Sequence, residues 1–147
     1  MEDKIMATFD LKSFDTISGS ETPTRVNLVN PQTKEEITIK NEDGTSTSLW
    51  VEILGPDSKK YKTENNKIIN NRIVANKKGG KVTAELMDQE NKKLVAAVIT
   101  GWSPEFVRDG APFPYSPENA KLFVEAYPPI YEQLNDFLQD RGNFVKN

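Results

Sequence analysis

LVAAVITGW (94–102) opens the stretch that decides the fold, and DGAPFPYSPENAKLFVEAY (109–127) and PPIYEQLNDFLQDRGNFVKN (128–147) continue it. The first piece predicts the apolar second half of a short helix. We expect that helix to end at Gly101, because Pro104 follows shortly and cannot continue it.

Two amphipathic helices are predicted after a turn at Asp109-Gly110. The first begins at Ser116-Pro117-Glu118, which combines a capping hydroxyl, a proline at the first helical position and an acid in the first turn. Pro128-Pro129 ends this helix and starts the second. Each helix carries one stripe at helical spacing. The stripes consist of Ala120, Phe123, Val124 and Tyr127 in the first helix, and of Ile130, Leu134, Phe137, Leu138 and Arg141 in the second. We therefore expect a bent helical hairpin.

Two more helices are predicted upstream. The sequence Gly55-Pro56-Asp57-Ser58 breaks the preceding segment, and Asp57 or Ser58 can cap a basic helix over about 59–77. The run 77–81 (KKGGK) stops it. Thr83 can cap the next helix, whose second half is apolar on more than one side and is therefore expected to be buried.

The N-terminal half predicts β-structure. Apolar residues alternate over 24–39 on both sides of a turn at 30–33, which favours a β-hairpin. Residues 48–54 are rich in β-branched and aromatic side chains and predict a third strand. Residues 1–23 show no regular period and are interpreted as an arm or irregular lead-in.

The predicted fold class is therefore α+β. A small N-terminal antiparallel sheet, made of a hairpin plus a third strand, is followed by a C-terminal group of three to four helices. We expect an N-terminal arm (1–23) and a single α+β domain (24–147), which divides into a β part (24–56) and a helical part (57–147). A chain of 147 residues has the usual size of one domain.

Composition excludes most catalytic and metal-binding designs. The chain has no cysteine and no histidine, so it lacks thiolate nucleophiles, Ser-His triads and His/Cys zinc sites. Paired acids such as Asp136 and Asp140 are expected on exposed helix faces, where they solubilise the protein. We expect no enzyme activity, no catalytic residue, no metal and no cofactor.

Targeting signals are also absent from the sequence pattern. No segment approaches the ~20 apolar residues of a membrane helix, and the N-terminus is too polar for a signal peptide. The lack of cysteine is compatible with a reducing cytoplasm. We expect a soluble cytoplasmic protein without a membrane partner.

Charge is distributed unevenly along the chain. Residues 57–81 hold eight basic and two acidic side chains, whereas both flanking segments are net acidic. Such a basic band can bind nucleic-acid phosphates. A sequence pI of about 5.1 and a single arginine in the band favour a solvated helix face, or a surface that docks onto an acidic protein. No nucleic-acid partner is expected.

Aromatic and apolar residues of the C-terminal stretch are the candidates for partner contact. Aromatic side chains in the proline-rich loop after Gly101 either cap the core or form a partner-binding patch, and both alternatives stay open. The candidate partner-binding residues are Val98, Trp102, Phe113, Tyr115, Phe123, Tyr127, Tyr131 and Phe144.

Four stretches, taken in their order, resemble the tail assembly chaperones of long-tailed bacteriophages. They are GPDSKKYK (55–62), LVAAVITGW (94–102), DGAPFPYSPENAKLF (109–123) and YPPIYEQLNDFLQDRGNF (127–144). Members of that family similarly show a Gly-Trp helix end, a DG-x-x-x-P/F-S-x-E-N segment and a final helix after a proline-containing turn. Residues 1–54 match nothing specific in the family.

The resemblance implies a non-enzymatic role in viral tail assembly. Such chaperones bind the phage tape measure protein, keep its long apolar helices soluble and help recruit tail tube protein. It also implies action in the host cell cytoplasm, absence from the mature virion and association with further copies of the same chain. A longer form made by ribosomal frameshifting is a further expectation, since Lys146-Asn147 is compatible with a slippery A-rich codon run. The alternative is a structural minor tail or head–tail joining protein that is retained in the virion.

Overall fold

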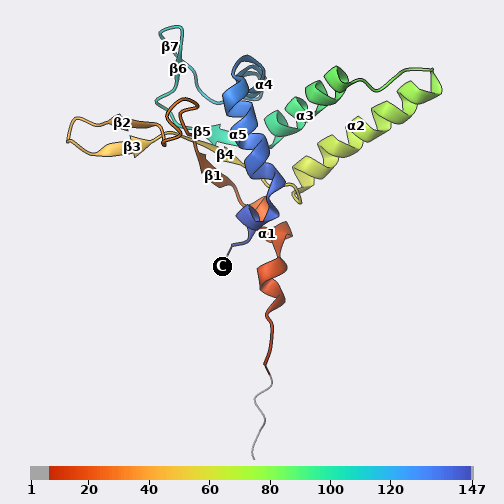
Figure 1. Cartoon of the computed structure of the whole chain (residues 1–147), viewed down its shortest axis with the longest axis horizontal. Coiled ribbons are helices and arrows are strands. Elements are labelled where there is room, and N and C mark those ends of the chain that lie inside the picture. Colours follow the sequence, from red (N-terminus) through yellow and green to blue (C-terminus); the bar gives the residue numbers. More distant parts are fainter. Residues whose placement is uncertain (1–6, 147) are drawn as a thin grey trace, which may run out of the picture.

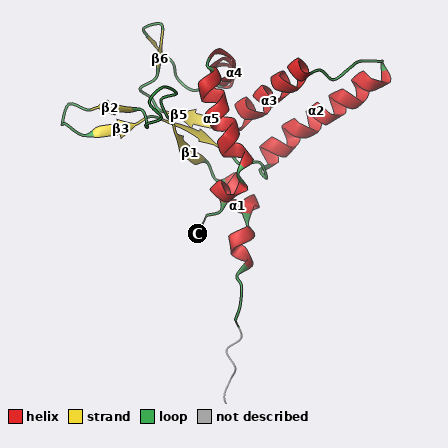
Figure 2. Ribbon diagram, viewed as in Figure 1, coloured by secondary structure: helices red, strands yellow, loops and turns green. Residues whose placement is uncertain are grey.

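The protein is described by a computed structural model that covers residues 7–146. Its α+β class confirms the prediction: a three-stranded antiparallel sheet, two short two-stranded ribbons and five α-helices occur within these residues (Figure 1). The α2–α3 hairpin and the N-terminal segment both extend away from the body, as the secondary-structure view makes plain (Figure 2).

The central sheet has the strand order β1-β4-β5. In this sheet β1 (Thr24–Asn27) and β5 (Ile99–Trp102) both pair antiparallel with β4 (Trp50–Ile53). Burial alternates along β4, so Val51 and Ile53 face the core while Trp50 and Glu52 lie on the other side. The sheet is therefore apolar on one face only, as is common for antiparallel sheets.

The predicted hairpin across residues 30–33 is present only next to its turn, where Val29 and Glu36 form an antiparallel bridge and the Ile37 N–H donates to the Leu28 carbonyl at 2.9 Å. Further from the turn the predicted pairing is wrong, because β1 pairs with β4, and β2 (Thr38–Lys40) pairs with β3 (Ser46–Ser48). Burial explains the choice, because Val51 and Ile53 are fully buried opposite β1 whereas Ile39 is only half-buried. The third strand of the sheet comes from the C-terminal half of the chain.

That third strand corrects the prediction of a helix ending at Gly101. Helix α3 (Ala84–Val98) ends at Val98, and residue Ile99 already has extended dihedral angles. The β-branched pair Ile99-Thr100 suits a strand, and Ile99 and Trp102 are buried. Gly101 lies inside β5, where it pairs with Glu52 of β4, and it does not end a helix.

The remaining predicted helices are confirmed at their starts. Helix α2 (Lys59–Lys77) is capped by Ser58, α3 by Thr83 and α4 (Pro117–Ala126) by Ser116, each through its hydroxyl. Helix α5 (Pro128–Gln139) begins at the proline pair. The predicted turn between β6 (Val107–Arg108) and β7 (Ala111–Pro112) is also present, with positive φ at Asp109 and Gly110.

The irregular lead-in expected over residues 1–23 is wrong for part of that range. Residues Leu11–Phe14 form the 3-10 helix η1 and Thr16–Glu21 form α1, capped by Asp10 and Asp15. Helix α1 packs against the C-terminal 3-10 helix η2 (Arg141–Phe144). The first six residues of that range lie outside the described part.

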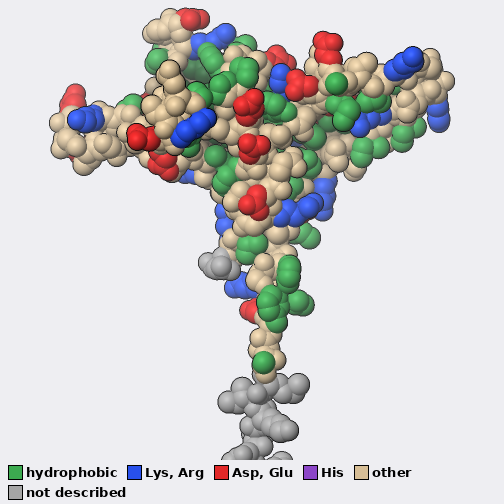
Figure 3. All heavy atoms as spheres, in the orientation of Figure 1, with side chains coloured by type: hydrophobic (Ala, Val, Ile, Leu, Met, Phe, Trp, Pro, Cys, Tyr) green, Lys and Arg blue, Asp and Glu red, His purple; other side chains and the backbone are tan. Residues whose placement is uncertain are grey.

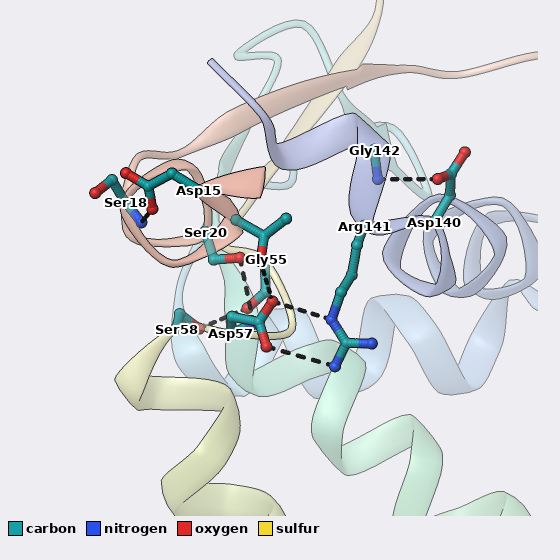
Figure 4. A network of polar contacts seen from close by, with 10 residues as sticks. Asp15, Ser18, Ser20, Gly55, Asp57, Ser58, Asp140, Arg141 and Gly142 are labelled. Atoms are coloured by element: carbon teal, nitrogen blue, oxygen red, sulfur yellow. Dashed lines mark hydrogen bonds and ion pairs between the residues drawn. The ribbon is translucent and has the colours of Figure 1, made fainter. Parts of the chain in front are cut away.

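A polar network joins these ends to the turn before α2 (Figure 4). The Asp57 carboxylate accepts hydrogen bonds from Thr16 Oγ1 at 2.6 Å and from Arg141 Nε at 3.0 Å. The Ser20 hydroxyl accepts the Asp57 N–H at 3.2 Å, and the Gly55 N–H donates to the Ser20 carbonyl at 2.8 Å. Three segments that are distant in sequence are thereby held at one point.

One hydrophobic core connects the sheet with α3, α4 and α5. Leu134 and Leu138 of α5 are fully buried against it, and the side-chain amide of Gln133 exchanges two hydrogen bonds with the backbone of Val29 at 2.8 and 2.7 Å. Helix α5 is thus fixed to the chain directly after β1 by both packing and polar contacts.

Candidate functional site

Most of the predicted partner-binding residues lie inside the core. Five of the eight are less than 9% exposed, and a partner can reach them only if the fold opens. These five are Val98, Trp102, Phe113, Phe123 and Phe144. The core alternative left open by the sequence is therefore the one that the structure supports for Trp102 and Phe113.

The aromatic residues form a stack that attaches the β6–β7 ribbon and α4 to the sheet. The Trp102 ring lies 4.4 Å from that of Phe123 and 5.4 Å from that of Phe113, both in stacked orientation. Trp102 Nε1–H donates to the Phe113 carbonyl at 2.8 Å, which satisfies its buried polar atom. The cluster is a structural element of the fold.

The three tyrosines of the candidate set reach the surface in part, but each hydroxyl has a partner. Tyr115 donates to the Ile99 carbonyl at 2.9 Å, and burial raises the pKa of its hydroxyl. The Tyr127 hydroxyl accepts from Arg108 Nε at 3.1 Å, and the Tyr131 hydroxyl accepts from Asn91. These hydrogen bonds brace neighbouring elements of the fold.

Helix α2 is the largest element with an uncovered surface. Of its nineteen residues only Ile68 is buried, and α3 is its main packing partner. Ile69 and Ile73, one turn apart on a common side of the helix, are 44% and 49% exposed. Val74 is also exposed. A helix of this length with one buried side chain has a face available to another protein.

A partly buried ion pair holds α2 on α3. Arg72 Nη2 and Nε donate to Glu90 Oε1 at 2.7 and 3.0 Å, and Glu90 is only 8% exposed. This hydrogen bond raises the pKa of Arg72. The contact joins the two helices of the hairpin to each other.

A groove of about 570 Å³ lies between α2, α3 and the start of α4. Ala96, Ala97 and Val124 contribute apolar surface to it. Its charged side chains are five lysines and two glutamates: Lys60, Lys67, Lys92, Lys93, Lys121, Glu64 and Glu125. All seven charged residues lie on helices. Because lysines outnumber glutamates, the groove combines an apolar wall with a net positive charge.

A second exposed apolar surface lies at the other end of the molecule. Phe9, Leu11, Phe14 and Ile17 are between 60% and 75% exposed, and the rings of Phe9 and Phe14 contact each other at 5.6 Å. We call residues 7–17 the projecting segment. Figure 3 shows hydrophobic side chains gathered on the stretch that hangs below the body.

Within residues 7–146, no group of three acidic, cysteine or histidine side chains is placed to hold a metal ion. In the same part of the chain, none of the helices combines the length and the apolar character needed to cross a membrane.

Comparisons with known proteins found no matching family model, no matching curated protein and no matching solved structure.

Sequence reasoning offered the basic helix over 59–77 as a surface that docks onto an acidic protein, but it missed the projecting segment as a site. The spacing of three residues between Leu11, Phe14 and Ile17 is visible in the sequence, but helices this short leave only a weak periodic signal. The stripe of α2 was visible as Ile69 and Ile73, yet only the structure shows that Ile68 alone turns inward.

Proposed function

We propose that this chain is a phage tail assembly chaperone that binds an apolar helix of the tape measure protein along α2. In this role it helps recruit tail tube protein during tail morphogenesis, acts in the host cell cytoplasm, and is not retained in the mature virion. The observation that carries the proposal is the single buried residue of α2.

Helices in proteins owe most of their stability to packing of an apolar face. Helix α2 has that face covered only by α3, and Ile69 and Ile73 remain half exposed beside it. A third helix laid against them would complete a three-helix unit. Burying the exposed half of each isoleucine contributes roughly 1 kcal/mol, and helix-in-groove recognition uses residues at this spacing.

Charge further restricts the partner. Helix α2 carries five lysines and one arginine against one glutamate. A partner helix with acidic residues flanking its apolar stripe would associate faster and with better orientation than a basic one. Binding is then expected to weaken as salt is raised, because exposed charges are screened.

The test is co-expression with a phage tape measure protein, followed by co-purification. Wild type should keep the tape measure protein soluble and bind it. The double variant Ile69→Asp/Ile73→Asp should lose it, because two charges would enter the apolar contact. Thr63→Asp/Asn70→Asp places the same charges on another side of α2, at exposed positions, and should retain binding.

Failure of the wild-type chain to co-purify would reject the tape measure protein as partner. Loss of binding in both double variants would reject the assignment to the Ile69/Ile73 side. The rival, a minor tail or head–tail joining protein, is separated by mass spectrometry of purified tails. A stoichiometric amount of this chain in mature particles would overturn the chaperone proposal.

A further inference from the structure

We propose that the projecting segment of one copy docks into the lysine-lined groove of a second copy of this chain. Four features carry this inference: the composition of the segment, its anchoring, the charge of the groove and the lysines in it that lack ion-pair partners.

The projecting segment has the composition of a binding element. Leu11 and Phe14 stand one above the other, because residues three apart eclipse in a 3-10 helix. Phe9 packs on Phe14 and extends this apolar ridge. Helices of four and six residues are not stable by themselves in water. Helix α1 is supported by η2, whereas the apolar ridge of η1 is left uncovered among residues 7–146, so a second molecule that covers the ridge would stabilise η1.

The segment cannot reach the groove of its own chain while α1 stays docked. The backbone of Gly19 lies directly against the Phe144 carbonyl, and Glu21 Oε1 accepts the Lys59 N–H at 3.1 Å. These contacts fix the direction of α1, and residues before it point away from the body (Figure 1). The ridge is therefore presented to another molecule.

Charge matches the segment to the groove. Residues 7–17 contain two acidic side chains and one basic side chain, whereas the groove is lined by five lysines and two glutamates. Opposite net charges favour docking and set its direction. The apolar wall formed by Ala96, Ala97 and Val124 offers the ridge a surface to bury against.

Two of the lysines are free to pair with the incoming segment. Lys60 and Lys67 pair with Glu64, and Lys92 pairs with Asp88 at 2.9 Å. Lys93 and Lys121 are exposed and have no ion-pair partner among residues 7–146. They lie on α3 and α4, so they place positive charge on two sides of the groove.

Each copy then offers one segment and one groove. The contact joins two different surfaces of the chain and is therefore heterologous. Two copies can exchange segments reciprocally, or copies can add head to tail. Docking between copies needs no tape measure protein, so it is measured on this chain alone and its failure leaves the proposed function untouched.

The experiment is sedimentation velocity over a range of concentrations. Wild type should form species of at least twice the 16.6 kDa of one chain. Leu11→Ser/Phe14→Ser, which alters the segment, and Lys93→Glu/Lys121→Glu, which alters the groove, should each sediment as a monomer. Lys77→Glu/Lys78→Glu makes the same charge change outside the groove and should associate like wild type.

Mixing the two defective variants is the decisive step. The segment variant keeps an intact groove and the groove variant keeps an intact segment, so the mixture should form a 1:1 dimer although neither variant dimerises alone. Restoration also shows that both variants are folded. A monomeric wild type at its highest soluble concentration, a mixture that stays monomeric, or groove variants that associate like wild type would each overturn the inference.

Discussion

Gly19 of α1 lies with its backbone against the carbonyl oxygen of Phe144, so that a side chain at residue 19 would overlap the η2 backbone. Phe144 is itself fully buried and contacts Phe137 of α5 at a ring distance of 5.5 Å. The position of α1, and through it the direction of the projecting segment, is thus set from the core.

Gly19→Ala is expected to destabilise this docking. The added methyl group cannot be accommodated by a side-chain movement, since the atom that it meets belongs to the backbone. Overpacking of this kind costs about 1–3 kcal/mol, which chemical denaturation would measure. Gly101→Ala is the matched control, because nothing lies within 4 Å of a Cβ there. Equal effects of the two substitutions would contradict the role of the Gly19 contact.

Asp57 should make stability depend on pH in the acid range. The Thr16 hydroxyl, and after it Arg141, hold the pKa of Asp57 below its ordinary value of 3.8. A carboxyl group whose folded pKa is depressed stabilises the fold above its unfolded pKa, and the effect is lost as pH falls through the folded pKa. Wild type should therefore lose stability as pH is lowered below about 4.

Asp57→Asn should have a lower melting temperature at pH 7 and a smaller drop between pH 7 and pH 3, because it removes the titrating group. Asp136→Asn, which removes an exposed acid on α5, is the control and should follow wild type. If the melting temperature of Asp57→Asn falls between pH 7 and pH 3 as much as that of wild type, other carboxyl groups cause the fall.

Phe123 should behave as a core residue in mutational tests. It is 2% exposed and stacks on Trp102, so Phe123→Ala is expected to lower the free energy of unfolding by about 3–5 kcal/mol. Val107→Ala, at a 66% exposed position of the neighbouring ribbon, should change it by no more than about 0.5 kcal/mol. Urea denaturation compares the two. A small effect at Phe123 would show that the stack is not closed in solution.

The Arg72–Glu90 pair should control the mobility of the α2–α3 hairpin. Arg72→Gln leaves the carboxylate of Glu90 buried without its charged partner, so amide exchange in α2 is expected to become faster. Arg72→Gln/Glu90→Gln removes both charges and should restore much of the protection. Mass spectrometry on peptides from 59–77 measures the rate of amide exchange. Identical rates in Arg72→Gln and wild type would contradict the role of the ion pair.

Helix starts were predictable because their signals are local. Ser58, Thr83 and Ser116 each cap the helix that directly follows, and Pro117 and Pro128 occupy first-turn positions. Strand pairing was not predictable in the same way. The partners of β4 lie far from it in sequence on both sides, and the apolar run 94–102 fits a buried helix and a buried strand equally well.

The burial of most candidate partner-binding residues was not predictable for a related reason. Aromatic side chains serve the core and binding surfaces alike, and only the tertiary structure assigns Trp102 and Phe123 to the core. The basic character of 57–81 was predictable from the sequence alone, whereas the groove that places Lys93 beside Lys121 depends on how α3 packs on α4.

The placement of α1 on η2 also orders events during synthesis. Residues 16–21 leave the ribosome early, but the surface that receives Gly19 does not exist until residues 141–144 have followed. Likewise the central strand β4 waits for residues 99–102 before its second edge is covered. The apolar helices η1 and α1 of a nascent chain therefore remain undocked until residues 141–144 have been made, and their final orientation forms only after that point.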